Sequence, residues 1–283
     1  MDGQEKKLLI IGCGYVGKAL GSHFFKKGWS VTGWARAQES VSGLASLGIE
    51  PHIGDVADER DWRGISPDFD QVVYCAATGG GGAASYGRVY LKGLSLADAF
   101  FPKNVPLLYT SSTSVYAQDG GEWVTEDSPS EPASETGRIL VETEKVVLAR
   151  NGTVARLGAI YGPGRSALLN QFFAGSPPSG NPDGWVNQIY RDDIIGAIEF
   201  LMERAQTGIV NVCDSEPVRR IELCKWFSER LKMPMPMAGG VPAPGGRDRG
   251  NKRVANTRLV GLGWNPRFPS FREGYEAVLK CGF

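Results

Sequence analysis

The stretch Lys7-Leu8-Leu9-Ile10-Ile11-Gly12-Cys13-Gly14-Tyr15-Val16-Gly17 decides the fold of this 283-residue chain. Its first five residues form an apolar run of strand length that leads directly into a Gly-x-Gly-x-x-Gly turn, as a buried parallel strand does. Residues 18–27 then place apolar side chains at helical spacing up to Gly28, and residues 29–34 read as a second strand. Strand, glycine turn, helix and strand fit into about thirty residues, the size of one βαβ unit.

The same alternation continues along the chain. We expect strands at 48–53, 71–75, 105–109, 152–157 and 208–213, and helices at 86–101, 135–150, 191–204 and 221–232. This pattern predicts an α/β fold of the Rossmann type, a doubly wound parallel sheet with a ligand crevice at the carboxyl ends of its strands. Beyond Tyr161 the chain becomes rich in Gly and Pro, notably at 175–184 and in a loop at 233–250. We therefore expect a dinucleotide-binding domain at 1–161, to which 186–214 returns, and a smaller substrate-binding lobe within 162–283.

Composition excludes several classes of function. The 31 basic and 31 acidic side chains cancel, so the charge excess of a nucleic-acid or anionic-membrane binder is missing and a small-molecule partner is expected. No apolar run approaches the roughly 20 residues that cross a bilayer, and residues 1–7 are polar, which predicts a cytoplasmic protein. Five scattered cysteines without a Cys-x-x-Cys pair argue against a disulfide framework or a metal site.

The glycine turn has the residues that a dinucleotide requires. Gly12 permits the tight turn, Gly14 lets the backbone approach a pyrophosphate, and Gly17 allows the helix to pack closely on the strand. Tyr15 and Val16 begin the helix, whose N-terminus attracts negative charge. We therefore predict a dinucleotide site here.

The end of the second strand favours NADP over NAD. An NAD site usually has Asp or Glu there, whereas this chain has Arg36, and its first carboxylate, Glu39, follows later. A guanidinium suits a 2′-phosphate, although Arg36 could also be an ordinary surface arginine, which leaves NAD open. Asp55 and Val56 follow the third strand, where they could border the adenine, or Asp55 could cap the next helix.

Several further motifs add a resemblance to these observations. They are residues 12–17, Cys75-Ala76-Ala77, Thr110-Ser111-Ser112-Thr113-Ser114-Val115-Tyr116, Tyr161-Gly162-Pro163-Gly164 and Tyr190-Arg191-Asp192-Asp193. Over nearly its whole length the chain resembles an extended short-chain dehydrogenase/reductase of the NAD-dependent epimerase/dehydratase family, in particular its atypical members. The resemblance implies that Cys75, Ala76, Ala77 and Ser111 lie beside the cofactor. It places the family's catalytic Ser or Thr at Ser112.

The chain departs from this family at two catalytic positions. The family uses a Tyr-x-x-x-Lys pair, and an alignment on Glu144 puts Thr136 and Leu140 in its place. A threonine hydroxyl is far too weak an acid to replace a phenol, and leucine carries no charge. The family also has an Asn three residues before the glycine that corresponds to Gly93, where this chain has Tyr90.

Three functions stay open after this comparison. The first is an NADP-dependent oxidoreductase or epimerase that acts on a small sugar-like or carbonyl substrate through a rebuilt active site with Ser112. The second is a non-catalytic NADP(H) sensor, and the third is a lyase or isomerase on the same fold. The amphipathic segment 135–150 also permits the homodimer that extended members often form.

Overall fold

The computed structural model describes residues 5–176, 180–236 and 250–281. The chain divides into two compact units, each built from three stretches of sequence. Unit 1 comprises Met1–Val115, Pro132–Arg156 and Ile195–Val210, and unit 2 comprises Tyr116–Glu131, Leu157–Ile194 and Asn211–Phe283. Residues 1–4 of the polar N-terminus, 177–179 of the Gly/Pro-rich stretch and most of the loop 233–250 lie outside the described residues.

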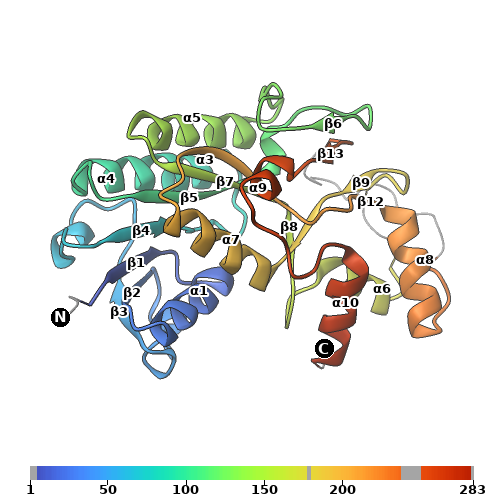
Figure 1. Ribbon diagram of the computed structural model, residues 1–283, viewed down its shortest axis with the longest axis horizontal. Helices are drawn as coiled ribbons and strands as arrows, with labels where there is room; N and C mark the ends of the chain where they lie inside the picture. Colours follow the sequence, from blue (N-terminus) through green and yellow to red (C-terminus); the bar gives the residue numbers. More distant parts are fainter. Residues whose placement is uncertain (1–4, 177–179, 237–249, 282–283) are drawn as a thin grey trace. The chain divides into compact units, whose positions relative to one another are not determined.

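A seven-stranded sheet in the order β11-β7-β5-β4-β1-β2-β3 confirms the predicted doubly wound fold (Figure 1). Its strands are β1 (Lys7–Ile11), β2 (Ser30–Ala35), β3 (Ile49–Ile53), β4 (Gln71–Tyr74), β5 (Leu107–Ser112), β7 (Thr153–Leu157) and β11 (Gly208–Val212). β1 pairs in parallel with both β2 and β4. Strand order reverses between β1 and β4, so their carboxyl ends form the switch point at which such sheets bind ligands.

Burial explains why these segments form strands. Leu8, Leu9, Ile10 and Ile11 are all fully buried, as expected for a parallel sheet covered on both faces. β5 begins two residues later than expected because Pro106 has no N–H group for the ladder; its carbonyl accepts the N–H of Val72.

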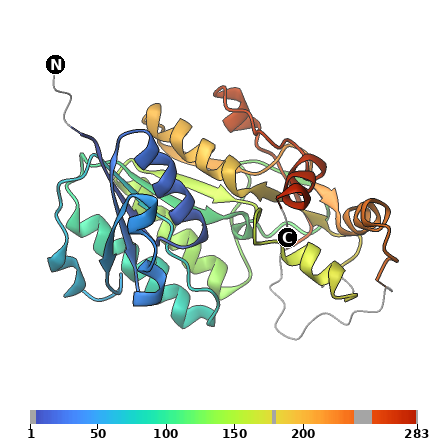
Figure 2. The same cartoon turned by 90° about the horizontal axis from the view of Figure 1, so that it is seen from below.

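Helices cover both faces of this sheet in unit 1 (Figure 2). α1 (Tyr15–Lys26) and α7 (Arg191–Glu203) lie on one face, where Glu199 bonds the side chains of His23 and Lys27. On the other face lie α3 (Gly82–Tyr86), η3 (Gly87–Lys92), α4 (Gly93–Phe100) and α5 (Glu135–Ala149). Shorter elements are α2 (Gln38–Val41), η1 (Ala45–Leu47), η2 (Asp61–Gly64) and η4 (Thr113–Val115).

The helix predicted at 86–101 differs from expectation in one respect. It starts at Gly82, and its middle, η3, is π-helical. Such stretches are rare and often occur at functional sites, because they turn side chains away from their α-helical direction. This segment carries Arg88 and Tyr90.

Unit 2 is built from short strands around its own aromatic core. Its strands are β6 (Trp123–Val124), β8 (Ala159–Tyr161), β9 (Trp185–Val186), β10 (Gln188–Tyr190), β12 (Val218–Arg219) and β13 (Arg253–Val254). They pair as β10 with β8, β12 with β9 and β13 with β6. The helices are α6 (Ala167–Phe173), α8 (Arg220–Leu231), α9 (Thr257–Gly261) and α10 (Phe271–Lys280). The core joins Tyr161, Phe227, Phe271 and Tyr275, among others.

No helix within the described ranges is long and apolar enough to cross a membrane. The same ranges contain no cluster of three or more His, Cys, Asp or Glu side chains suited to a metal ion.

Candidate dinucleotide site

Gly12 makes the turn that joins β1 to α1. Its φ is +100°, a conformation that L side chains rarely adopt. A Cβ atom here would also lie 2.2 Å from the backbone nitrogen of Ala76. Both constraints demand glycine, and both follow from the close approach of the turn to the end of β4.

Gly14 and Gly17 differ in what surrounds them. A Cβ on Gly17 would lie 2.5 Å from the carbonyl oxygen of Gly12, so this glycine is needed for packing. Around Gly14 no atom of the described residues beyond its chain neighbours lies within 4 Å of the corresponding position. The backbone at Gly14 is thus open to a ligand, whereas the space beside Gly17 is occupied by the protein's own backbone.

The N-terminus of α1 is suited to an anion. Gly14 is its N-cap, Tyr15 and Val16 are its first residues, and its first turn contains no acidic side chain. The first N–H groups of a helix have no partner within it, and the helix dipole adds partial positive charge there. A pyrophosphate would therefore be attracted to this end.

The end of β4 lies against the turn. The Cys75 thiol donates a hydrogen bond to the Gly12 carbonyl at 3.2 Å, and the Cys75 N–H bonds the Ile11 carbonyl. Burial raises the pKa of the Cys75 thiol, and it raises the pKa of Cys13 to about 12. Both thiols are therefore protonated and unreactive at neutral pH. The segment continues with Ala76 and Ala77, whose side chains are small.

Arg36 directly follows β2 and is exposed. It makes no ion pair or hydrogen bond with any residue in the described parts of the chain. By contrast, two other arginines have partners within the protein: Arg138 bonds the Ala133 carbonyl, and Arg191 pairs with Asp192. Arg36 is thus a cation whose donors are available to a ligand.

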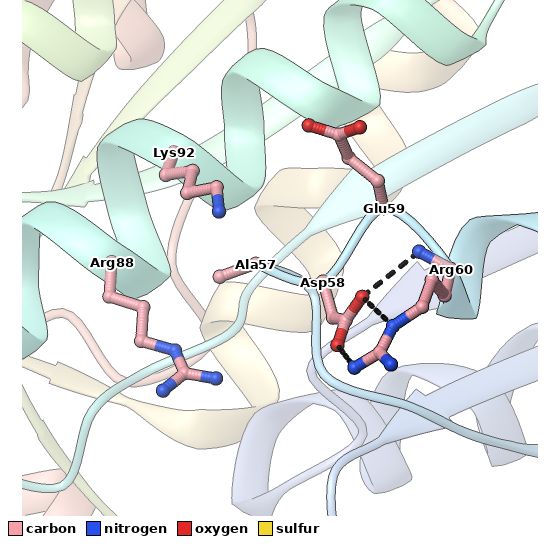
Figure 3. A pocket seen from close by; sticks show the side chains of 6 residues that line it. All are labelled: Ala57, Asp58, Glu59, Arg60, Arg88 and Lys92. Carbon is pink, nitrogen blue, oxygen red and sulfur yellow. Dashed lines mark hydrogen bonds and ion pairs between the residues drawn. The ribbon is translucent and has the colours of Figure 1, made fainter.

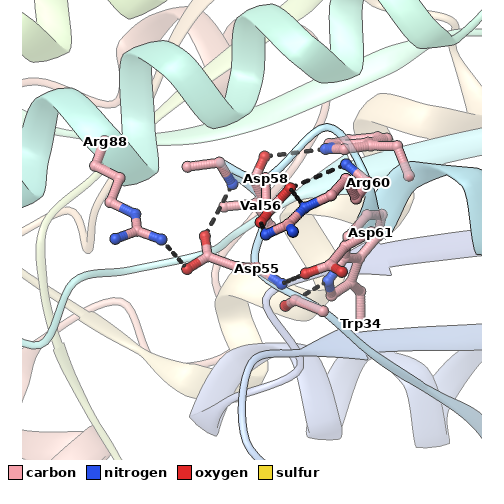
Figure 4. Close-up of polar contacts among 10 residues, drawn as sticks. Trp34, Asp55, Val56, Asp58, Arg60, Asp61 and Arg88 are labelled. Atoms are coloured by element: carbon pink, nitrogen blue, oxygen red, sulfur yellow. Dashed lines mark hydrogen bonds and ion pairs between the residues drawn. The ribbon is translucent and has the colours of Figure 1, made fainter.

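Asp55 is held in a rigid loop after β3 (Figure 4). Its Oδ1 accepts the Ala57 N–H at 2.9 Å, and its own N–H donates to Asp61 at 2.7 Å. Its Oδ2 pairs with Arg88 at 2.5 Å. The next helical element, η2, has Arg60 as its N-cap, so Asp55 does not cap that helix. The cap hypothesis is therefore wrong.

Two tryptophan side chains hold the same loop by hydrogen bonds to its carbonyl groups. Trp34 Nε1 donates to the Gly54 carbonyl at 2.7 Å, and Trp62 Nε1 donates to the Val56 carbonyl at 3.0 Å. Their rings are in contact and both are buried. Val56 itself is 8% exposed and belongs to the core of unit 1.

A polar groove of about 530 Å³ adjoins this loop (Figure 3). Its lining residues are Ala57, Asp58, Glu59, Arg60, Arg88 and Lys92. Arg60 forms a two-point ion pair with Asp58, which holds the pKa of that carboxyl well below its usual range. Arg88 and Lys92 are the cations that the helix contributes.

The two serines at the end of β5 have different roles. The Ser111 hydroxyl is buried and donates to Glu144 at 2.5 Å. Ser112 is half-buried, and its Oγ accepts the Ser114 N–H at 3.2 Å. The Ser111 hydroxyl thus donates its proton within the protein, whereas the Ser112 hydroxyl can still donate its proton to a ligand.

Glu144 and Arg156 form a buried ion pair that the sequence did not reveal. Both side chains are 3% exposed, and Arg156 Nη2 lies 2.6 Å from Glu144 Oε2 while its Nε lies 3.0 Å from Oε1. Arg156 therefore does not face solvent. The pair instead anchors Ser111, next to Ser112.

Thr136 and Leu140 lie in the first two turns of α5. Ser134 caps this helix by accepting the Gly137 N–H. Thr136 is half-buried and bonds only weakly, at 3.4 Å, to Ser134 Oγ. Leu140 is 4% exposed and packs inside. Neither residue provides an acid or a cation.

Two residues from the motifs in unit 2 bond other parts of the protein. Tyr116 is buried and donates to Asn211 at 2.9 Å, and Asp193 accepts the N–H groups of Arg267 and Phe268. Asp214 is 2% exposed, and neither of its carboxyl oxygens makes a good hydrogen bond within the described residues. Burial raises its pKa well above the usual value, although the nearby Glu216 N–H opposes this shift. Its burial was not predictable from sequence spacing.

Comparisons with known proteins agree with this geometry. The profile of the NAD dependent epimerase/dehydratase family matches residues 8–213. Protein YeeZ of Escherichia coli (strain K12) is 34% identical over 232 residues, which cover 76% of this chain and 81% of YeeZ. A 3-diazoavenalumate denitrifying reductase of Streptomyces sp is 28% identical over 209 residues, covering 68% and 66% of the two chains.

Among solved structures, a conserved protein of unknown function from Silicibacter pomeroyi DSS is similar along almost its whole length. The two chains are 28% identical, and the match covers 98% of this chain and 99% of the other with a TM-score of 0.78. The family profile spans well over half of the chain and includes the glycine turn, both serines and Glu144. The chain therefore belongs to the NAD dependent epimerase/dehydratase family.

Proposed function

We propose that this protein is an NADP-dependent oxidoreductase that acts on a small sugar-like or carbonyl substrate without the family's Tyr and Lys. The observation that carries the cofactor preference is Arg36, an exposed guanidinium without a partner in the described chain, one residue beyond β2. The similarity to a reductase supports oxidoreduction rather than epimerisation.

The proposed cofactor site uses residues of unit 1. The N-terminus of α1, with Gly14, Tyr15 and Val16, would hold the pyrophosphate, and Arg36 would pair with the 2′-phosphate. Asp55 and Val56 would border the adenine, and the main chain at Cys75, Ala76, Ala77 and Ser111 would line the path of the dinucleotide. When bound, NADPH supplies a hydride.

Ser112 is the proposed catalytic residue. Because its Oγ already accepts a hydrogen bond from Ser114, its O–H is free to donate to a substrate oxygen and so orient and polarise a carbonyl. Thr136 and Leu140 replace the Tyr and Lys in the sequence alignment. We infer that the proton which completes a reduction comes from water or from the substrate.

The absence of a phenol and an ammonium at these positions equally suits a sensor of NADP(H) that signals to another protein. A lyase or isomerase on this fold is the third candidate. The proposed homodimer would use α5, and a cytoplasmic location stays a prediction.

Calorimetric titration with NADPH, NADP, NADH and NAD tests the proposal. Arg36→Ala should weaken NADPH at least tenfold and leave NADH unchanged, because only NADPH carries the 2′-phosphate. Arg63→Ala is the matched control, since Arg63 is also exposed and without a partner in the described chain. Equal loss in both variants, or no preference for NADPH in the native protein, would refute the NADP assignment.

A substrate screen then separates enzyme from sensor. The native protein should oxidise NADPH with at least one small carbonyl compound, and Ser112→Ala should lower kcat at least tenfold while NADPH affinity stays unchanged. The sensor would be favoured if none of the compounds is turned over and if NADP and NADPH protect the protein from protease to different extents.

A further inference from the structure

The side chain of Arg88 crosses from the π-helical segment η3 to the loop after β3 (Figure 4). It is 60% exposed, and its Nη2 lies 2.5 Å from Asp55 Oδ2. A single exposed ion pair contributes little to stability, because water screens the attraction between the two charges. Stability alone is therefore a weak reason for this contact.

The carboxyl group that receives Arg88 cannot move freely. Its other oxygen accepts the Ala57 N–H, and the backbone on both sides is fixed by Asp61, Trp34 and Trp62. Asp55 consequently sets the position of the guanidinium. The guanidinium of Arg88 is a planar group that is anchored at Asp55 and belongs to a side chain that is 60% exposed.

The register of the sheet locates this guanidinium relative to the phosphate turn. β1, β2 and β3 are adjacent and parallel, with Ile11 beside Trp34 and Ala35 beside Ile53. A dinucleotide held at the N-terminus of α1 extends its adenosine half along the carboxyl ends of these strands. The adenine would then lie between the end of β2 and the Asp55 loop, below Arg88.

We propose that Arg88, held by Asp55, is a specificity-determining residue that stacks its guanidinium on the adenine ring of the dinucleotide. Guanidinium groups stack on aromatic faces, and a compact ammonium cannot do so as a plane. This inference rests on the proposed dinucleotide binding and deepens it, because it names the group that recognises the base.

Lys92 provides the internal comparison. It lies on the same π-helical segment and lines the same groove as Arg88 (Figure 3), and its charge helps to lower the pKa of Asp58. General attraction of phosphate by positive charge would involve both cations. Stacking on adenine involves only Arg88.

The test is a set of calorimetric titrations with NADPH and with reduced nicotinamide mononucleotide, which lacks the adenosine half. Arg88→Ala should weaken NADPH about three- to thirtyfold and leave the mononucleotide unchanged. Arg88→Lys, which keeps the charge, should weaken NADPH nearly as much as alanine does. Lys92→Ala should stay within about twofold of the native protein.

Other outcomes separate this inference from the proposed function. If the native protein binds NADPH but Arg88→Ala does not change the affinity, or Lys92→Ala weakens it equally, the stacking role is overturned and the cofactor assignment stands. If Arg88→Ala weakens the mononucleotide as well and lowers the melting temperature, Arg88 only braces the loop. A native protein that binds no dinucleotide overturns both proposals.

Discussion

Replacing Glu144 by glutamine should lower the stability of unit 1 more than removing the charge of any other side chain on α5. Glu144 accepts two hydrogen bonds from Arg156 through Nε and Nη2 and one from Ser111, and both charged side chains are 3% exposed. Glutamine has one acceptor oxygen instead of two, and its NH2 group would face one of the donors of Arg156 or Ser111. The guanidinium of Arg156 would stay buried without a counter-charge.

The magnitude follows from this burial. Removing one partner of a buried ion pair costs about 3 to 5 kcal/mol, because the remaining charge is desolvated without compensation. In a domain of this size each kcal/mol lowers the melting temperature by about 2 to 4 °C. We therefore expect a decrease of about 6 to 20 °C.

Glu142→Gln is the matched control for this experiment. Glu142 lies on the same helix and pairs with Lys145, but its side chain is 54% exposed. Its replacement should cost about 0.3 to 0.5 kcal/mol, as for other exposed helix pairs. Urea unfolding followed by circular dichroism gives both free energies.

Two results would refute the reasoning. One is that Glu144→Gln and Glu142→Gln differ by less than about 0.5 kcal/mol. The other concerns the double substitution Glu144→Leu with Arg156→Met, which removes both charges and should recover most of the lost stability. A double variant less stable than Glu144→Gln would show that the charge itself is not what the site requires.

Two further predictions concern the phosphate turn and a buried acid. Gly14→Ala should leave the melting temperature unchanged, since no atom lies within 4 Å of the added methyl, but weaken NADPH in calorimetry because that space faces the ligand. Gly17→Ala should lower the melting temperature, since its methyl meets the Gly12 carbonyl at 2.5 Å; equal melting temperatures would contradict this. Asp214 has a raised pKa in the folded state, so its contribution to stability is complete below its unfolded pKa of about 3.9 and is lost as pH rises toward the folded pKa. Asp214→Asn should therefore be more stable than the native protein at neutral pH and lose less stability as pH rises above about 4 in urea unfolding. Parallel pH profiles of the two proteins would show that Asp214 does not ionise in this range.

Local sequence was sufficient for the elements and for the phosphate turn. The periods of apolar residues and the spacing of Gly12, Gly14 and Gly17 are properties of neighbours along the chain, so strand, turn and helix could be read directly. The three glycines also proved to differ as expected, with Gly12 strained, Gly17 packed and Gly14 open. The doubly wound parallel sheet could be predicted because a right-handed alternation of strands and helices admits few arrangements.

Tertiary structure decided which charged groups have partners. Ser111 and Glu144 are 33 positions apart, as are Asp55 and Arg88, and no periodicity links such pairs. The same reason explains why the buried ion pair of Arg156 with Glu144 and the buried Asp214 were not foreseen. The sequence by itself determined the fold and the glycine turn, because both depend on local conformation. Which cations are free to meet a ligand was decided only by folding, because it depends on the carboxylates that distant segments bring beside them.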